Sequence, residues 1–217
     1  MMDDQERQKA LLTALTTEHF VLQTALNGTM SESSARAPLY IVTLSSSLIA
    51  MGFVAESSAV FLPFVATVLP AVFVLGVLTV LRLVDSALEM SNFLAGIARI
   101  RAHYRTLTPE AEAYFAPQFG RWPEANVDSM PVFKLGLVAA FLTTNATMIA
   151  FVNSLVAGAG VALLTSSLLG DPHIAFALGL GGVAVVVVIA LFYVYQRWRI
   201  TDSSEQAHPS TEPTLSK

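Results

Sequence analysis

The sequence predicts an all-α polytopic membrane protein with four transmembrane helices and cytoplasmic helical extensions. Three observations lead to this fold class. The 217-residue chain is 54% hydrophobic, only 13% of its residues are charged, and several uncharged runs are long enough to cross a bilayer. Soluble domains carry roughly 25% charged residues. Because the hydrocarbon core is about 30 Å thick, a crossing helix needs about 20 apolar residues.

Uncharged runs of this length place the four spans. The first span is predicted at 38–55 and the second at 59–81. The third run begins after Lys134 and is longer than one crossing needs, so we expect its membrane part at 135–158. The fourth span is predicted at 174–195.

The distribution of Lys and Arg predicts the orientation of these spans. All 12 basic residues lie before the first span, between the second and third spans, or after the fourth. The positive-inside rule then places both termini and the long middle segment in the cytoplasm. An odd number of spans would divide the basic segments between the two sides, so the charge pattern favours four.

The segments outside the spans are predicted to be partly helical. Apolar residues at helical spacing indicate an amphipathic helix that ends at Gly28, and a second helical pattern continues span two as far as Leu107. Thr108 is placed as the N-cap of a short helix that reaches Phe115. The chain divides into a cytoplasmic amphipathic helix (1–30), transmembrane helices 1 and 2 (31–81), a cytoplasmic helical extension and loop (82–131), transmembrane helices 3 and 4 (132–200) and a disordered tail (201–217).

The sequence contains no signature of an enzyme. The absence of Cys excludes thiolate metal sites and disulfides, and the histidines lie in separate segments. Gly179, Gly181 and Gly182 resemble a dinucleotide fingerprint only superficially, because they lie inside a span, where small residues allow helices to approach closely. We therefore expect no catalytic residue, no cofactor and no metal site.

Polar residues inside the spans form two stripes at helical spacing. The first span contributes Arg36, Tyr40, Thr43 and Ser47, widened by Ser45 and Ser46, and the third span contributes Thr143, Thr147 and Ser154. Two interpretations stay open. The polar groups form hydrogen bonds between helices, each worth about 0.6 kcal/mol, or they line a path for ions. Because one chain of four spans is too small to enclose a pore, the second interpretation requires a homo-oligomer.

A basic group lies in the extension that follows the second span. It consists of Arg99, Arg101, His103 and Arg105, in pairs that flank the apolar stripe on either side. The first interpretation is that these side chains contact lipid headgroups and contribute to the positive-inside orientation. The functional interpretation is a site for an anionic nucleotide or oligonucleotide.

Three blocks of sequence resemble a group of small four-span bacterial membrane proteins that is commonest in actinobacteria. The first block lies within 15–54, the second contains Ile97-Ala98-Arg99-Ile100-Arg101 and Tyr114-Phe115, and the third contains Leu142-Thr143-Thr144 and Met148–Ser154. More loosely, the architecture is similar to membrane effectors of nucleotide-signalling anti-phage systems of the CBASS, Pycsar and Hailong types. Those effectors damage the host membrane when a nucleotide signal changes.

The resemblance and the polar stripes together imply a homo-oligomeric effector of the bacterial inner membrane. We expect a gated pore or ion channel that disrupts the membrane potential during phage infection. Its expected partners are the lipid bilayer, further copies of itself, and a nucleotide or oligonucleotide signal with its synthase. The alternative is a non-conducting membrane adaptor or scaffold that recruits a cytosolic partner through the helices at 5–27 and 83–115. A transporter is disfavoured because no buried charge or broken helix is evident.

Overall fold

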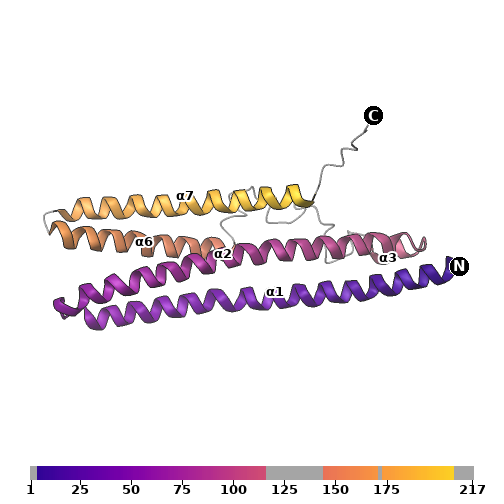
Figure 1. The fold of residues 1–217 in the computed structure, drawn as a ribbon, viewed down its shortest axis with the longest axis horizontal. Coiled ribbons are helices and arrows are strands. Elements are labelled where there is room, and N and C mark those ends of the chain that lie inside the picture. The colour runs from indigo at the N-terminus through magenta and orange to yellow at the C-terminus, as the bar shows by residue number, and fades with distance from the viewer. Residues whose placement is uncertain (1–3, 116–143, 171–172, 208–217) are drawn as a thin grey trace, which may run out of the picture. The chain divides into compact units, whose positions relative to one another are not determined.

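The computed structural model describes residues 4–115, 144–170 and 173–207 (Figure 1). Helices make up 94% of the described residues and no strand occurs among them, which confirms the all-α prediction. The helices are α1 (Asp4–Val54), α2 (Ser58–Arg105), α3 (Ala111–Phe115), α6 (Asn145–Leu169) and α7 (Ile174–Ala207). All of these except α3 are long and apolar enough to cross a membrane. The chain is therefore a membrane protein of the expected fold class.

Helix α1 has no break between its amphipathic part and the first span, so the prediction that a helix ends at Gly28 is wrong. A glycine inside a helix costs only about 1 kcal/mol relative to alanine, which a long helix with good formers on both sides tolerates. One turn later, Glu32 and Arg36 form an ion pair at i,i+4 spacing, with 2.6 Å between Oε1 and Nη2. This pair supports the helix in the region where the break was expected.

Helix α2 carries the second span into the extension, as the sequence predicts, and continues to Arg105. The backbone N–H of Ala111 donates to Oγ1 of Thr108 at 3.3 Å. This bond confirms Thr108 as the cap of α3, which ends at Phe115 as expected. The predicted loop at 116–131 lies outside the described residues, and so does the stretch from 132 to 143 at the start of the third span.

The last two helices extend beyond their predicted ends. Helix α6 passes position 158 and stops where Gly170 adopts a φ of 79°, a left-handed conformation that ends helices. Helix α7 continues through 201–207, so the prediction of a disordered tail is wrong for these residues. They contain neither Gly nor Pro, and the next proline along the chain is Pro209. Residues 208–217 lie outside the described part of the chain.

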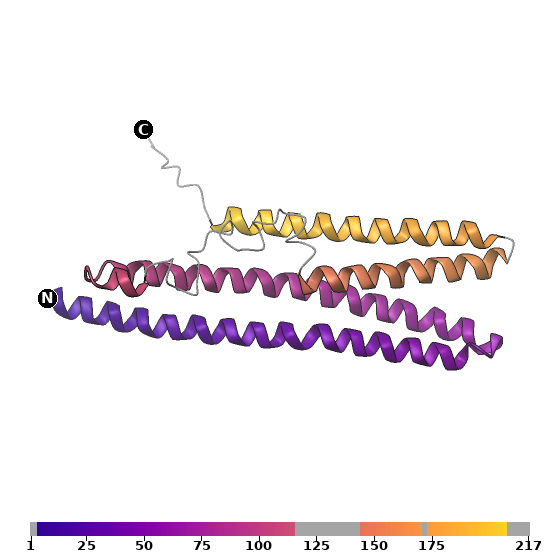
Figure 2. The ribbon, with the colours of Figure 1, turned by 180° about the vertical axis from the view of Figure 1, so that it is seen from behind.

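The chain forms two compact units. We call Met1–Leu39 with Leu81–Met148 the coiled-coil unit, and Tyr40–Val80 with Ile149–Lys217 the span unit. Within the coiled-coil unit, the first half of α1 and the second half of α2 lie side by side and antiparallel, as the two opposite views agree (Figures 1 and 2). Within the span unit, α6 and α7 form a second antiparallel pair.

Candidate functional site

A heptad seam holds the coiled-coil unit together. Its residues recur at alternating spacings of three and four and are buried or half-buried. On α2 they are Leu83, Ser86, Met90, Phe93, Ile97, Ile100 and Tyr104, and on α1 they include Leu12, Leu15, His19, Leu22 and Leu26. This spacing is typical of knobs-into-holes packing between two helices. At Gly96 the helices are close, because a Cβ there would lie 2.9 Å from Cδ1 of Leu22.

Two polar residues occupy positions in this apolar seam. Ser86 is fully buried, and its Oγ has no hydrogen-bond partner among the described residues. His19 places Nε2 3.0 Å from Nε2 of Gln23, while its Nδ1 is buried without a partner in the described part of the chain. Burial lowers the pKa of His19 below its ordinary value, and the positive charge of Arg101 lowers it further. The seam therefore favours neutral His19.

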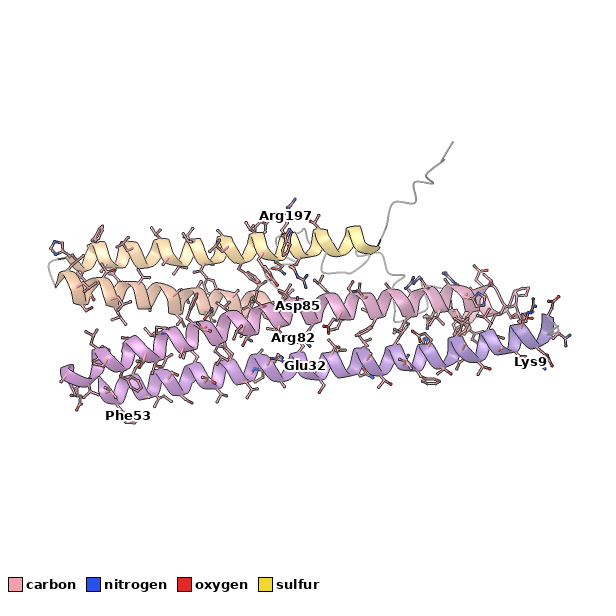
Figure 3. The ribbon with its side chains drawn as sticks, viewed as in Figure 1. Lys9, Glu32, Phe53, Arg82, Asp85 and Arg197 are labelled. Carbon is pink, nitrogen blue, oxygen red and sulfur yellow. The ribbon has the colours of Figure 1, made fainter. Side chains whose placement is uncertain are left out.

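A charge network links α1 to α2 near the first span (Figure 3). Glu32 Oε1 accepts from Arg36 at 2.6 Å on its own helix and from Arg82 Nε on α2 at 3.3 Å. Arg82 Nη1 also donates to Glu89 at 3.3 Å. These side chains are 37–43% exposed, so solvent screens the pairs and they contribute little to stability.

The basic group lies at the end of the coiled-coil unit where α2 meets α3, and its members have different surroundings. The Cζ atom of Arg101 lies 5.7 Å from the centre of the Phe115 ring, so a cation–π contact joins α2 to α3. Tyr104 packs beside the same ring, with centroids 5.4 Å apart, and its ring centre is 6.4 Å from that of His19. Arg99 is exposed, whereas His103 and Arg105 are half-buried. Among the described residues, neither Arg99 nor Arg101 forms an ion pair with a carboxylate.

A buried hydrogen bond lies at the centre of the span unit. Tyr40 Oη donates to Asn153 Oδ1 at 3.1 Å, and both side chains are almost completely buried. Gly76 on α2 faces the same asparagine, since a Cβ at this position would lie 2.9 Å from Nδ2 of Asn153 and closer still to its Oδ1. Asn153 is therefore the residue at which α1, α2 and α6 meet. Ser154 beside it is fully buried, and its Oγ donates to the carbonyl of Phe151 at 2.6 Å.

The other polar residues of the two stripes have different surroundings. Thr43, Ser45 and Ser46 are exposed on the surface of the chain. Ser47 is half-buried, and its Oγ donates to the carbonyl of Thr43 at 2.8 Å. On α6, Thr147 is half-buried, with its Oγ1 2.9 Å from that of Thr144, and Thr143 lies outside the described residues. The polar residues of α1 thus divide into an inward part at Tyr40 and exposed hydroxyl groups at Thr43, Ser45 and Ser46.

Two glycines allow α6 and α7 to make backbone contact. A Cβ at Gly158 would lie 2.8 Å from the carbonyl oxygen of Gly181, and a Cβ at Gly181 would lie 2.7 Å from the carbonyl oxygen of Gly158. Gly179 and Gly182 have no atom within 4 Å of the corresponding position. The close-packing interpretation is therefore confirmed for Gly181, whereas Gly179 and Gly182 approach no other helix among the described residues of this chain.

The chain has no match among protein-family models, curated proteins or solved structures. Within the described ranges, no group of three or more His, Asp or Glu residues is arranged to hold a metal ion.

Proposed function

We propose that the protein is a homo-oligomeric membrane effector that forms a gated ion pathway and disrupts the membrane potential. In this proposal a cytoplasmic nucleotide or oligonucleotide signal controls the pathway, and the setting is anti-phage defence in the bacterial inner membrane. The defence setting comes from the similarity of the small four-span architecture to membrane effectors of nucleotide-signalling anti-phage systems. The proposal assigns no catalytic step to the protein.

The observation that supports ion conduction is the set of exposed hydroxyl groups on α1 in the first span. Thr43 and Ser46 lie one turn apart on the same side of a helix long and apolar enough to cross a membrane, Ser45 lies further around this helix, and all three are exposed on the single chain. A hydroxyl in hydrocarbon needs a partner, which is either its own backbone or another polar surface. Several α1 helices around one axis would supply that surface and a polar path between them.

The continuity of two helices supports the part of the proposal in which a signal outside the membrane reaches the spans. Helices α1 and α2 each continue from the coiled-coil unit into a span without a break. A change at one end of a continuous helix is transmitted along it more directly than through a flexible linker. In the proposal the signal acts at Arg101, Tyr104 and Phe115, where α2 meets α3 and the guanidinium group has no carboxylate partner among the described residues.

Cysteine accessibility tests the ion pathway, because the natural chain contains no Cys. We expect the Ser46→Cys variant in sealed membrane vesicles to react with a charged, membrane-impermeant thiol reagent, since a water-lined position supports the thiolate. The matched control is Leu48→Cys, which is exposed at a similar depth but about 200° around α1. Absence of labelling at Ser46→Cys, or equal labelling of both variants, contradicts the pathway.

The alternative function is a non-conducting adaptor, and one observation favours it. Tyr114 on α3 is 78% exposed at the far end of the coiled-coil unit, where a cytosolic partner would find an aromatic anchor. A membrane-potential dye separates the two functions in bacteria that express the protein and are infected with phage. An effector depolarises these cells before lysis, whereas an adaptor leaves the potential equal to that of cells without the protein.

A further inference from the structure

The side of α1 turned away from α2 carries almost no charge. Between positions 10 and 31, Glu18 is the only Asp, Glu, Lys or Arg. The part of α2 that packs against this stretch has six such residues within 82–105, namely Arg82, Asp85, Glu89, Arg99, Arg101 and Arg105. A two-helix coiled coil in water normally has charged residues on the outer positions of both helices. The two helices of this unit therefore differ in the surface that they present.

The uncharged side has the spacing of a second seam. Alternating steps of three and four connect exposed residues on the side opposite the α2 contact. These residues, which we call the outer α1 face, are Ala10, Thr13, Thr17, Phe20, Thr24, Asn27 and Ser31. Phe20 lies at the middle of the outer α1 face and is 62% exposed. A strip of small, uncharged residues at 3–4 spacing with one exposed aromatic residue is compatible with packing on another helix.

The threonines of the outer α1 face direct their hydroxyl groups back to their own helix. Oγ1 of Thr13 donates to the carbonyl of Lys9 at 2.9 Å, that of Thr17 to the carbonyl of Thr13 at 3.0 Å, and that of Thr24 to the carbonyl of Phe20 at 2.8 Å. The hydroxyl hydrogens are therefore already used. What remains available on these threonines is mainly the methyl group, so contact with another uncharged helix leaves none of their hydroxyl donors unsatisfied.

We propose that the outer α1 face packs against the same face of α1 in a second copy of this chain, with the two helices parallel and in register. The membrane argues for this occupant, because α1 continues into the first span and a bilayer holds all copies in one orientation. Copies confined to one membrane also meet at high effective concentration. In such a pair the two copies are related by a two-fold axis along the membrane normal. The same surface of each copy therefore forms the contact.

The size of the outer α1 face supports association within a membrane rather than in solution. From Ala10 to Ser31 it spans 22 positions and therefore forms a strip about 33 Å long, and helices pack with about 10 Å between their axes. A strip of these dimensions covers far less than the roughly 800 Å² per partner of a stable interface between free proteins. We therefore expect the contact to weaken when the protein is diluted in detergent. The inference rests on the homo-oligomer part of the proposed function and is independent of conduction.

Single-cysteine cross-linking in native membranes tests the proposal. Thr17→Cys and Thr24→Cys lie one heptad apart, and parallel helices in register bring each residue close to its own copy. We expect mild oxidation to convert most of each variant to a covalent dimer of twice the chain mass. The matched control is Asn92→Cys, an exposed position on α2, which should remain monomeric. Phe20→Lys in the Thr24→Cys chain should reduce the dimer at least tenfold.

Four results would overturn the proposal. Cross-linking at only one of the two positions indicates helices that are not parallel and in register, and equal cross-linking of Asn92→Cys indicates random collisions. A conjugate of another mass identifies a different protein as the occupant. Protection from aqueous thiol reagents without a dimer identifies lipid. Circular dichroism of the purified variants verifies that each is folded. Because Ser46→Cys labelling does not involve the outer α1 face, the two proposals can fail separately.

Discussion

Replacing Gly181 by alanine measures how closely α6 and α7 approach. The added Cβ lies 2.7 Å from the carbonyl oxygen of Gly158 and 3.1 Å from Cβ of Ala162, whereas ordinary contact begins at 3.4 Å. The nearest obstacle is a backbone atom, so no side-chain rotation relieves the overlap. The two helices have to move apart, and the atoms packed along their contact lose part of their van der Waals attraction.

The adjacent Gly182 provides the reference for the size of this effect. Alanine at Gly182 meets nothing within 4 Å and gains about 0.5–1 kcal/mol from its higher helix propensity. Alanine at Gly181 has the same gain but also the cost of overpacking, which is about 1–3 kcal/mol. The propensity term cancels between the two variants. We therefore expect Gly181→Ala to be about 1–3 kcal/mol less stable than Gly182→Ala.

The free energy of unfolding is measured for both variants in mixed micelles by titration with SDS, with helix content followed by circular dichroism. Gly158→Ala should behave like Gly181→Ala, and the double variant should cost less than the sum, because one separation of the helices relieves both overlaps. Equal stability of Gly181→Ala and Gly182→Ala, within about 0.5 kcal/mol, would refute the backbone contact.

Three further predictions concern the polar contacts. Tyr40→Phe removes the hydrogen bond to Asn153 and should lower the free energy of unfolding by about 0.6 kcal/mol, and at most by about 2, in the same SDS titration. The thermal stability of the coiled-coil unit should fall as pH is lowered through 6.5, because the unfolded chain then binds a proton that folded His19, with its lowered pKa, does not bind. Glu32→Gln should weaken the contact of α1 with α2, and the loss should shrink at high salt, as measured by thermal melting at low and high ionic strength.

A specific result would contradict each of these predictions. An unchanged unfolding free energy in Tyr40→Phe would show that the hydroxyl group is not bonded in the protein. His19→Gln should flatten the pH dependence, and an equally steep fall in that variant would assign the proton to another group. A loss in Glu32→Gln that is the same at both ionic strengths would show that charge is not its cause.

The fold could largely be predicted because its main signals are local. Glu56 interrupts the apolar run between the end of α1 at Val54 and the start of α2 at Ser58, and Thr108 has the chemistry of a cap for α3, so these boundaries follow from the chain itself. Gly28 was misleading, since a single glycine is a weak signal inside a helix of 51 residues. The extent of α6 was also not predictable, because the run from 135 to 170 contains no charge to mark a membrane boundary.

The candidate site depends on neighbours that the sequence does not reveal. Helical spacing places Tyr40, Thr43 and Ser47 on one stripe, but the boundary between buried and exposed surface passes through it. Tyr40 is buried against its hydrogen-bond partner Asn153, which lies 113 positions away in the sequence. The heptad seam, in contrast, was present in the sequence. The steps from Leu83 to Tyr104 alternate strictly between three and four, which distinguishes a coiled coil from a general amphipathic helix.

The paired seam of α1 and α2 also restricts how such a chain changes its length in evolution. Deleting one residue from the coiled-coil part of α1 rotates everything before it by about 100°, which takes Leu12 and Leu15 off the contact. Deleting seven residues leaves every side chain on its original face. Because the two helices run antiparallel, a matching heptad must be lost from α2, or part of α1 is left without a partner. Related chains should therefore differ in this region by whole heptads removed from both helices together, whereas the connection at 55–57 is free to vary by single residues.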